Sequence, residues 1–195
     1  MQTDGIPLIR MAFPTRIYLT GFMGSGKTTI GPLLARRLGY DYFDLDEAIE
    51  SVAGKTVQEI FVVDGEEAFR RLEALKLRAV SRRAREVISM GGGAVTSGDN
   101  LYFAKTNGAV IYLRVEPTVL AERLRESAVR RPLLQDAQGK PLEGGALLRR
   151  IEKMLEERER YYEQADITLD IGSHSIDEVV EMTLEALKRH AERSH

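Results

Sequence analysis

The sequence predicts an α/β protein in which a parallel β-sheet is covered by helices on both faces. Short, apolar, β-prone segments alternate with segments of helical spacing along nearly the whole chain, an alternation typical of parallel sheets with right-handed connections. A second observation is a glycine-rich loop between the first expected strand and the first expected helix. A third is that three polar or glycine-rich features follow strands on one side of the sheet, where α/β proteins bind ligands.

The spacing of apolar residues places the expected strands and helices along the chain. Strands are expected at residues 16–19, 40–46, 86–90, 109–115 and 166–171. Helices are expected at residues 27–38, 46–52, 56–85, 99–105, 117–125, 145–163 and 175–191. Residues 130–145 contain two prolines and no clear period, which favours a long loop. Such a loop is either a lid over a site or a tolerated surface insertion.

Length and composition indicate one globular domain. The 195 residues are 43% hydrophobic and 30% charged, as in ordinary globular proteins. We expect a domain over residues 15–195 after an N-terminal extension, residues 1–14, that is disordered. The formal charge of -2 provides no general attraction to nucleic acid or membrane. Without cysteine, a secretory signal or an apolar run near ~20 residues, the expected compartment is the cytoplasm.

The loop from Gly21 to Thr28 matches G-x-x-x-x-G-K-[ST] at every fixed position. Glycines let backbone N–H groups surround phosphate oxygens, and the following helix N-terminus adds a favourable dipole. Lys27 would supply a charge for the β and γ phosphates, and Thr28 a hydroxyl for Mg²⁺. The alternative is a glycine turn with a solvated lysine. The candidate ATP-binding residues here are Gly24, Ser25, Gly26, Lys27, Thr28 and Thr29.

Two carboxylates, Asp44 and Asp46, lie at the end of the segment 40–46, where the second expected strand runs into a helix. Alternation along an extended segment would place both on one side. One near Mg²⁺ and the other near an acceptor hydroxyl would serve phosphoryl transfer. A helix begins in the same place, so either residue has the alternative role of a helix cap.

Three arginines are candidates for holding an anionic acceptor. Arg70 sits beside Phe69, where an aromatic ring and a planar cation together suit a small ring that carries a carboxylate. Arg131 lies in the expected loop, and Arg158 lies in a charged helix. Each has the alternative of a solvated surface arginine, and the three become informative only if the fold brings them together.

A glycine triplet, Gly91, Gly92 and Gly93, ends the third expected strand. Three successive glycines cost backbone entropy, which indicates a close approach by a ligand or another segment, with a tight turn as the alternative. His174 is a candidate neighbour of a nucleotide base, whereas His190 and His195 are expected in a polar tail. The three histidines have no metal-ligand spacing.

The segments GFMGSGKTT, DLD, DGEEAFRRLE, MGGGAV, RPLL and ERERYYEQAD resemble the shikimate kinases in order and spacing, over about residues 16–185. The resemblance implies a three-layer P-loop kinase fold like that of nucleoside-monophosphate kinases, with a five-stranded parallel sheet. It implies an acceptor-binding region at about residues 44–73 and a lid at about residues 126–145. The implied reaction transfers the ATP γ-phosphoryl group to the 3-hydroxyl of shikimate, in the route to chorismate. A monomer is expected.

The resemblance also implies a role for each candidate residue. On the nucleotide side, Lys27 grips the phosphates, Thr28 and Asp44 hold Mg²⁺ (the aspartate through water), Arg123 stacks on adenine, and Arg131 swings over the transferred phosphate. On the acceptor side, the resemblance implies that Asp46 binds the hydroxyls and serves as base, that Arg70 and Arg158 clamp the carboxylate, and that Gly91, Gly92 and Gly93 line the ring.

Two other functions were weighed against this one. A kinase for another small acid, such as gluconate, shares the phosphate loop, but FRRLE, GGGA and RPLL argue against it. An ATP-binding module without catalysis has no need of an acceptor pocket, so the DLD segment and the three arginines argue against that function.

Overall fold

The computed structural model describes residues 13–127 and 131–193. The prediction that residues 1–14 are disordered falls almost entirely outside this range. The sheet has five strands in the order β2-β3-β1-β4-β5, and every neighbouring pair is parallel. The expected five-stranded parallel sheet is therefore confirmed. Its strands are β1 Arg16–Thr20, β2 Asp41–Asp44, β3 Glu86–Ser89, β4 Ala109–Arg114 and β5 Ile167–Asp170.

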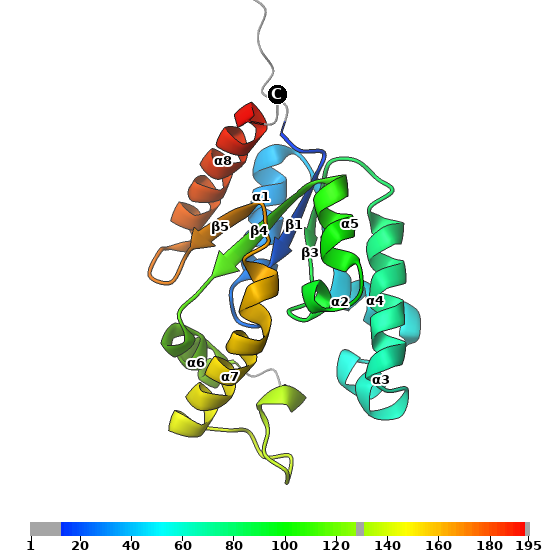
Figure 1. Ribbon diagram of the computed structural model, residues 1–195, viewed down its shortest axis with the longest axis vertical. Coiled ribbons are helices and arrows are strands. Elements are labelled where there is room, and N and C mark those ends of the chain that lie inside the picture. Colours follow the sequence, from blue (N-terminus) through cyan, green and yellow to red (C-terminus); the bar gives the residue numbers. More distant parts are fainter. Residues whose placement is uncertain (1–12, 128–130, 194–195) are drawn as a thin grey trace, which may run out of the picture.

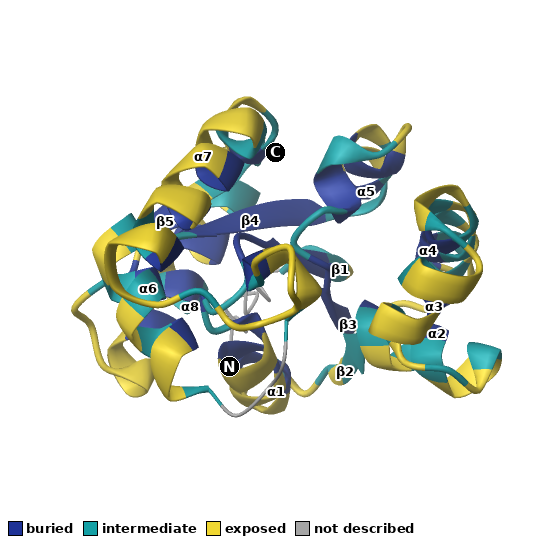
Figure 2. Ribbon diagram, turned by 90° about the horizontal axis from the view of Figure 1, so that it is seen from below, coloured by how far each residue is buried: buried dark blue, intermediate teal, exposed yellow. Residues whose placement is uncertain are grey.

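Helices cover both faces of the sheet, which makes the expected three layers. α1 and α8 lie on one face, whereas α5 and α7 lie on the other (Figures 1 and 2). The central strands β1, β3 and β4 are buried on both sides, as their nearly continuous apolar sequences require. The helices are α1 Lys27–Leu38, α2 Leu45–Ala53, α3 Val57–Val63, α4 Glu66–Val80, α5 Asn100–Asn107, α6 Pro117–Glu126, α7 Gly144–Tyr162 and α8 Ile176–Arg193.

The expectation of a single helix over residues 56–85 was wrong. α3 ends at Val63, and α4 begins at Glu66. The break lies at Asp64 and Gly65, where Gly65 has a φ of +86°. That left-handed backbone suits glycine and is incompatible with a continuing helix, and the dipeptide Asp-Gly is itself a turn signal. The break places α2, α3 and α4 together at the β2 edge of the sheet (Figure 2).

The described part of the expected long loop at residues 130–145 is ordered rather than without structure. It contains the short 3-10 helix η2, Pro132–Leu134, and an antiparallel bridge between Gln135 and Pro141. The Asp136 carboxylate accepts two backbone N–H groups of the turn between them, at 2.9 Å each. No helix within residues 13–127 and 131–193 is long and apolar enough to cross a membrane.

The carboxyl ends of three neighbouring strands carry the features singled out in the sequence. β1 runs into the glycine-rich loop, β2 ends at Asp44, and β3 is followed by Met90 and the glycine triplet. Because parallel strands end on the same edge of a sheet, these segments converge there, at the lower edge of the sheet in Figure 1.

Candidate active site

A cavity of about 910 Å³ opens at this edge of the sheet. That volume accommodates a nucleotide together with a small second substrate. Its lining includes every candidate site residue of the sequence analysis, drawn from the phosphate loop and the start of α1, the end of β2, α2, α4, the glycine triplet, α6, the residue before η2, and α7. They are Gly24, Ser25, Gly26, Lys27, Thr28, Thr29, Asp44, Asp46, Arg70, Gly91, Gly92, Gly93, Arg123, Arg131 and Arg158.

The phosphate loop has a backbone that requires glycine. Gly21, Gly24 and Gly26 have φ values of +142°, +82° and +97°, and a Cβ on Gly21 would lie 2.7 Å from a backbone oxygen of β4. Lys27 is 8% exposed and its Nζ donates to the carbonyls of Gly21 and Phe22 at 2.8 and 3.0 Å. The amine therefore faces the inside of the loop, where phosphate oxygens would bind, and is not a solvated surface charge.

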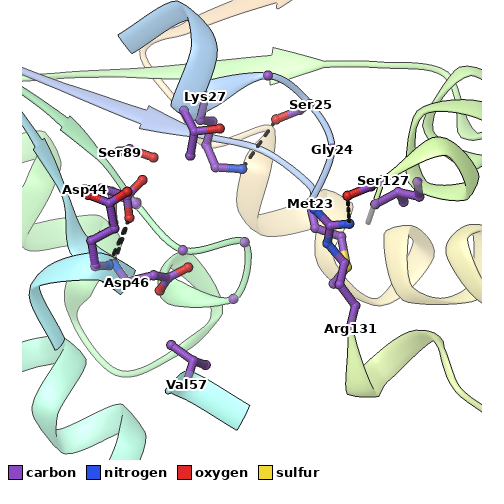
Figure 3. Close-up of a pocket in the computed structure, with 18 of the residues that line it drawn as sticks. Met23, Gly24, Ser25, Lys27, Asp44, Asp46, Val57, Ser89, Ser127 and Arg131 are labelled. Atoms are coloured by element: carbon purple, nitrogen blue, oxygen red, sulfur yellow. Dashed lines mark hydrogen bonds between the residues drawn. The ribbon is translucent and has the colours of Figure 1, made fainter. Parts of the chain in front are cut away.

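The charge of Lys27 depends on its two acidic neighbours. Burial lowers the pKa of Lys27 to about 8, and Asp46 and Asp44 oppose that shift. The amine is thus still mainly protonated at neutral pH. In Figure 3, Asp44 and Asp46 lie on one side of the cavity, Arg131 lies on the other, and Lys27 lies between them.

Asp44 and Asp46 have different structural roles. Asp44 is the N-cap of α2, because its Oδ1 accepts the backbone N–H groups of Asp46 and Glu47 at 3.0 and 3.3 Å. The helix-cap alternative therefore holds for Asp44, which also lines the cavity. Asp46 lies in the first turn of α2 rather than on an extended segment, which corrects the expected alternation. Burial, and then Asp44, raise the pKa of Asp46 to about 6.

Arg70 lies in the cavity and not on the outer surface of α4. Its side chain is 19% exposed, and its Nη1 lies 3.0 Å from Oε2 of the fully buried Glu73. Its guanidinium carbon is 5.9 Å from the centre of the Phe61 ring and 5.3 Å from that of Phe69. Burial raises the pKa of Glu73 to about 7, and Arg70 opposes that shift. The ion pair with Glu73 therefore holds the Arg70 guanidinium, which lines the cavity.

Two glycines of the triplet, Gly91 and Gly93, lie very close to side chains of the site. A Cβ on Gly91 would lie 2.8 Å from Oδ1 of Asp46, and one on Gly93 would lie 2.6 Å from Nη2 of Arg70. A Cβ on Gly92 would lie 3.4 Å from the backbone of the phosphate loop. The close-approach interpretation thus holds for Gly91 and Gly93, beside side chains of α2 and α4. The turn interpretation holds as well, because the Ala94 N–H donates to the Gly91 carbonyl at 2.9 Å.

Arg158 reaches the same triplet from α7. Its Nη1 donates to the Gly92 carbonyl at 3.5 Å, and its guanidinium carbon lies 5.8 Å from the centre of the Phe22 ring. Arg70 and Arg158, on different helices, therefore both border the glycine segment that lines the cavity. The fold brings together the two arginines that were ambiguous in the sequence.

Two further arginines, Arg123 and Arg131, line the cavity. Arg123 of α6 donates to the carbonyls of Gly24 and Gly172 at 3.4 and 3.2 Å, which links the phosphate loop to the turn after β5. Arg131 donates to Oγ of Ser127 at 3.1 Å, as Figure 3 shows. His174 lines the cavity near these groups, beside apolar residues of the β5–α8 connection and α8, Ile171, Ile176 and Val179.

The side-chain oxygen atoms near Lys27 fit a magnesium ion whose other ligands are water and substrate phosphates. Thr28, Asp44 and Ser89 line the cavity with hydroxyl and carboxylate groups, and Asp44 and Ser89 are register partners on β2 and β3. Within the described ranges there is no cluster of three acidic or histidine side chains that would hold a metal alone. Mg²⁺ keeps several waters and binds substrate phosphates together with one or two carboxylates, so these residues fit it.

Sequence reasoning missed several residues of the site. Glu73 was not among the candidate residues, although its position three residues after Arg70 on one helix was a usable signal. Tyr162 lies one helical turn after Arg158 and donates its hydroxyl to the Gly92 carbonyl. Phe61 and Ser89 also line the cavity, and no pattern in the sequence distinguished them.

Known proteins match this chain over most of its length. The sequence profile of the family described as SKI, shikimate kinase, matches residues 23–188. A shikimate kinase of Prosthecochloris aestuarii is 42% identical over 183 residues, which cover 94% of this chain and 92% of the relative.

Solved structures agree with these sequence matches. A shikimate kinase of Bacteroides thetaiotaomicron has a TM-score of 0.81 and 38% identity, covering 90% of this chain and 99% of that one. One from Acinetobacter baumannii, in complex with shikimate, has a TM-score of 0.79 and 32% identity, covering 90% and 93%. A gluconokinase of Sinorhizobium meliloti, at 22% identity and a TM-score of 0.55 over 93% of this chain and 95% of that one, shares the fold alone. This chain belongs to the shikimate kinase family.

Proposed function

We propose that the residues lining this cavity carry out phosphoryl transfer from ATP to the 3-hydroxyl of shikimate, which yields shikimate 3-phosphate and ADP. The observation that carries the assignment is the convergence of Arg70, Arg158 and Asp46 on the glycine triplet beside a triphosphate loop. Shikimate is a small polyol with one carboxylate. Arginines donate charge-assisted hydrogen bonds to a carboxylate, and an aspartate accepts hydrogen bonds from hydroxyl groups.

The phosphate loop and its neighbours would hold ATP. The loop amides and the N-terminus of α1 face the phosphates, and Lys27 supplies a positive charge among them. Arg123 is already fixed between the loop and the turn after β5. We assign the adenine to the space between Arg123 and the apolar residues Ile171 and Val179, where an aromatic base is covered on both sides.

Thr28 and Asp44 would hold Mg²⁺, Asp44 through water because its oxygens already accept hydrogen bonds from α2 and from Tyr42. When bound, the ion neutralises charge on the β and γ phosphates. Asp44 also acts without the metal: it is one of the groups that raise the pKa of Asp46. Asp44 thus caps α2 and also contributes, after burial, to the raised pKa of Asp46.

Asp46 is assigned as the base. It accepts the proton of the shikimate 3-hydroxyl while that oxygen forms a bond to the γ phosphorus and the bond between the γ phosphorus and the β–γ bridging oxygen breaks. Its pKa of about 6 leaves it ionised at neutral pH yet more basic than an exposed carboxylate. Arg70 and Arg158 hold the shikimate carboxylate so that the hydroxyl faces the phosphate loop.

Residues 126–145 are assigned as the lid and residues 44–73 as the acceptor-binding region. Arg131 lines the cavity opposite Asp46 (Figure 3), so a small inward movement would place its guanidinium near the transferred phosphoryl group. Covering the site also excludes water, which would otherwise accept the phosphoryl group.

An acceptor assay tests the assignment. ADP release is measured with shikimate, quinate and gluconate in turn, each with ATP and Mg²⁺. We expect turnover with shikimate and little with the other two, because neither presents the same ring with the 3-hydroxyl aimed at the loop. Preferred turnover of gluconate would point to the kinase for another small acid. ATP binding without turnover of any of the three would point to a non-catalytic module.

We also propose that the enzyme acts as a monomer in the cytoplasm, where ATP is made. All the groups assigned above come from one chain, so the reaction needs no residue from a second copy. Light scattering coupled to gel filtration, at the concentration of the assay, tests this: the active species is expected to have the mass of one chain.

A further inference from the structure

The Gly92 carbonyl receives hydrogen bonds from two side chains of α7. Tyr162 donates its hydroxyl to this oxygen, and Arg158 donates from Nη1 at 3.5 Å. Tyr162 and Arg158 are four residues apart and so lie on the same face of the helix. Gly92 itself lies against the backbone of the phosphate loop. The Gly92 carbonyl thus joins α7 to the glycine triplet, next to the phosphate loop.

The hydroxyl of Tyr162 is held firmly in place. The residue is fully buried, and its ring stacks on that of Tyr112 in β4, with 4.9 Å between ring centres and an interplanar angle of 19°. Burial raises the pKa of Tyr162 to about 12, although Arg158 opposes the shift. The phenol therefore stays protonated and remains a donor throughout the physiological range.

This bond determines what Arg158 can do. The Tyr162 hydroxyl lies within hydrogen-bond distance of the carbonyl, whereas 3.5 Å is at the long limit for the Arg158 bond. The tyrosine therefore satisfies the carbonyl, and the arginine remains available for an anion. Without the phenol oxygen, a half-buried carbonyl would need another donor, and Arg158 is the neighbouring cation that can supply one.

We propose that Tyr162 is a positioning residue for the acceptor carboxylate: its hydroxyl occupies the Gly92 carbonyl and thereby keeps the guanidinium of Arg158 directed at shikimate. The inference rests on the proposed role of Arg158. It adds a residue that does not touch the substrate and acts through another side chain.

Tyr112 provides a matched control. It is the other ring of the same stack, it is 1% exposed, and its hydroxyl donates to Glu159 rather than to Gly92. Tyr162→Phe and Tyr112→Phe each delete one phenol oxygen and keep both rings. Thermal midpoints of both variants are measured first, and kinetics are recorded well below the lower midpoint, so that both proteins are folded in the assay.

The expected result is a selective loss. Tyr162→Phe should raise the KM for shikimate about 5- to 10-fold, the effect of one lost neutral hydrogen bond, with the KM for ATP changed less than about twofold. Tyr112→Phe should leave the shikimate KM within about twofold of the unaltered protein. Equal increases in both variants would show a general loosening of the stack and overturn the proposal, as would an unchanged KM in Tyr162→Phe.

A double-mutant cycle separates this inference from the function proposed above. If Tyr162 acts through Arg158, Tyr162→Phe should add nothing to the shikimate KM of Arg158→Ala. Additive effects would overturn the positioning role while leaving the role of Arg158 intact. If Arg158→Ala alone leaves shikimate binding unchanged, the assigned carboxylate site is wrong, and the positioning role falls with it.

Discussion

The two halves of the cavity are built in opposite ways. The phosphate loop is one continuous segment whose shape comes from glycines with positive φ and whose ligands are mostly backbone amides. The acceptor side is assembled from side chains on α2, α4 and α7 around the glycine triplet, and Arg158 lies 66 residues from Gly92. The loop is a local structure, whereas the acceptor side exists only once the chain has folded.

The two halves also treat charge differently. The loop concentrates positive charge in one amine, Lys27. The acceptor side buries acids and bases together: Asp46 and Glu73 both have a raised pKa, and Arg70 opposes the shift in each. Substitution of Lys27 in the loop should therefore abolish the reaction, whereas substitutions on the acceptor side should cause losses of activity of different sizes. The following predictions test that contrast, from the largest expected effect to the smallest.

Lys27→Met should abolish turnover, with a loss of at least about a thousandfold, because no other group in the loop carries its charge to the phosphates. ADP release in a coupled assay measures this, and calorimetry should find shikimate binding retained. The control is Lys153→Met, an exposed lysine of α7. Near-normal activity of Lys27→Met would disprove the assignment of the phosphate loop.

Asp46→Asn should lower kcat by roughly 10²- to 10⁴-fold, the usual contribution of a general base. It should not lower the thermal midpoint, because Asp44 and not Asp46 caps α2. Asp99→Asn, an exposed aspartate outside the cavity, is the control. An unchanged kcat would remove Asp46 from the reaction.

Arg70→Ala and Arg158→Ala should each weaken shikimate binding by about 1.5–3 kcal/mol, or roughly 10- to 150-fold in KM, with the KM for ATP little changed. They should differ in stability, because Arg70→Ala alone leaves the buried Glu73 without its ion pair. The control is Arg71→Ala, the exposed neighbour paired with Glu67. Normal shikimate affinity in both cavity variants would rule out the carboxylate clamp.

The pH dependence of kcat should follow the protonation of Asp46. Because its folded pKa is about 6, kcat should fall roughly tenfold per pH unit below that value as the base becomes protonated. The folded pKa lies above the ordinary aspartate value of 3.8, so this group favours folding at low pH, and that contribution is lost as pH rises from about 4 to 6. Asp46→Asn should thus gain stability relative to the unaltered protein over this range, as denaturant titrations at several pH values would show.

Much of this molecule could be predicted without coordinates. Alternating periods predicted the parallel sheet, because strands and helices bury different faces. The phosphate loop was readable because its function depends on a contiguous backbone shape. The break at Gly65 was missed because apolar spacing continues across it and only the Asp-Gly signal marks the turn. The order in residues 131–145 was missed because a side chain, Asp136, adds two hydrogen bonds to the backbone bonds of the turn, and no periodicity marks it.

The sequence by itself therefore determined the fold class, the phosphate loop and the family. Only the tertiary structure decided that Arg70 and Arg158 line one cavity, that Glu73 is ion-paired with Arg70, and that the Tyr162 hydroxyl meets the carbonyl beside Arg158. The physical reason is the distance along the chain over which each interaction acts. Backbone dihedrals and periodicity are set by neighbours in the chain, whereas burial, ion pairing and a shifted pKa depend on groups that only folding brings together.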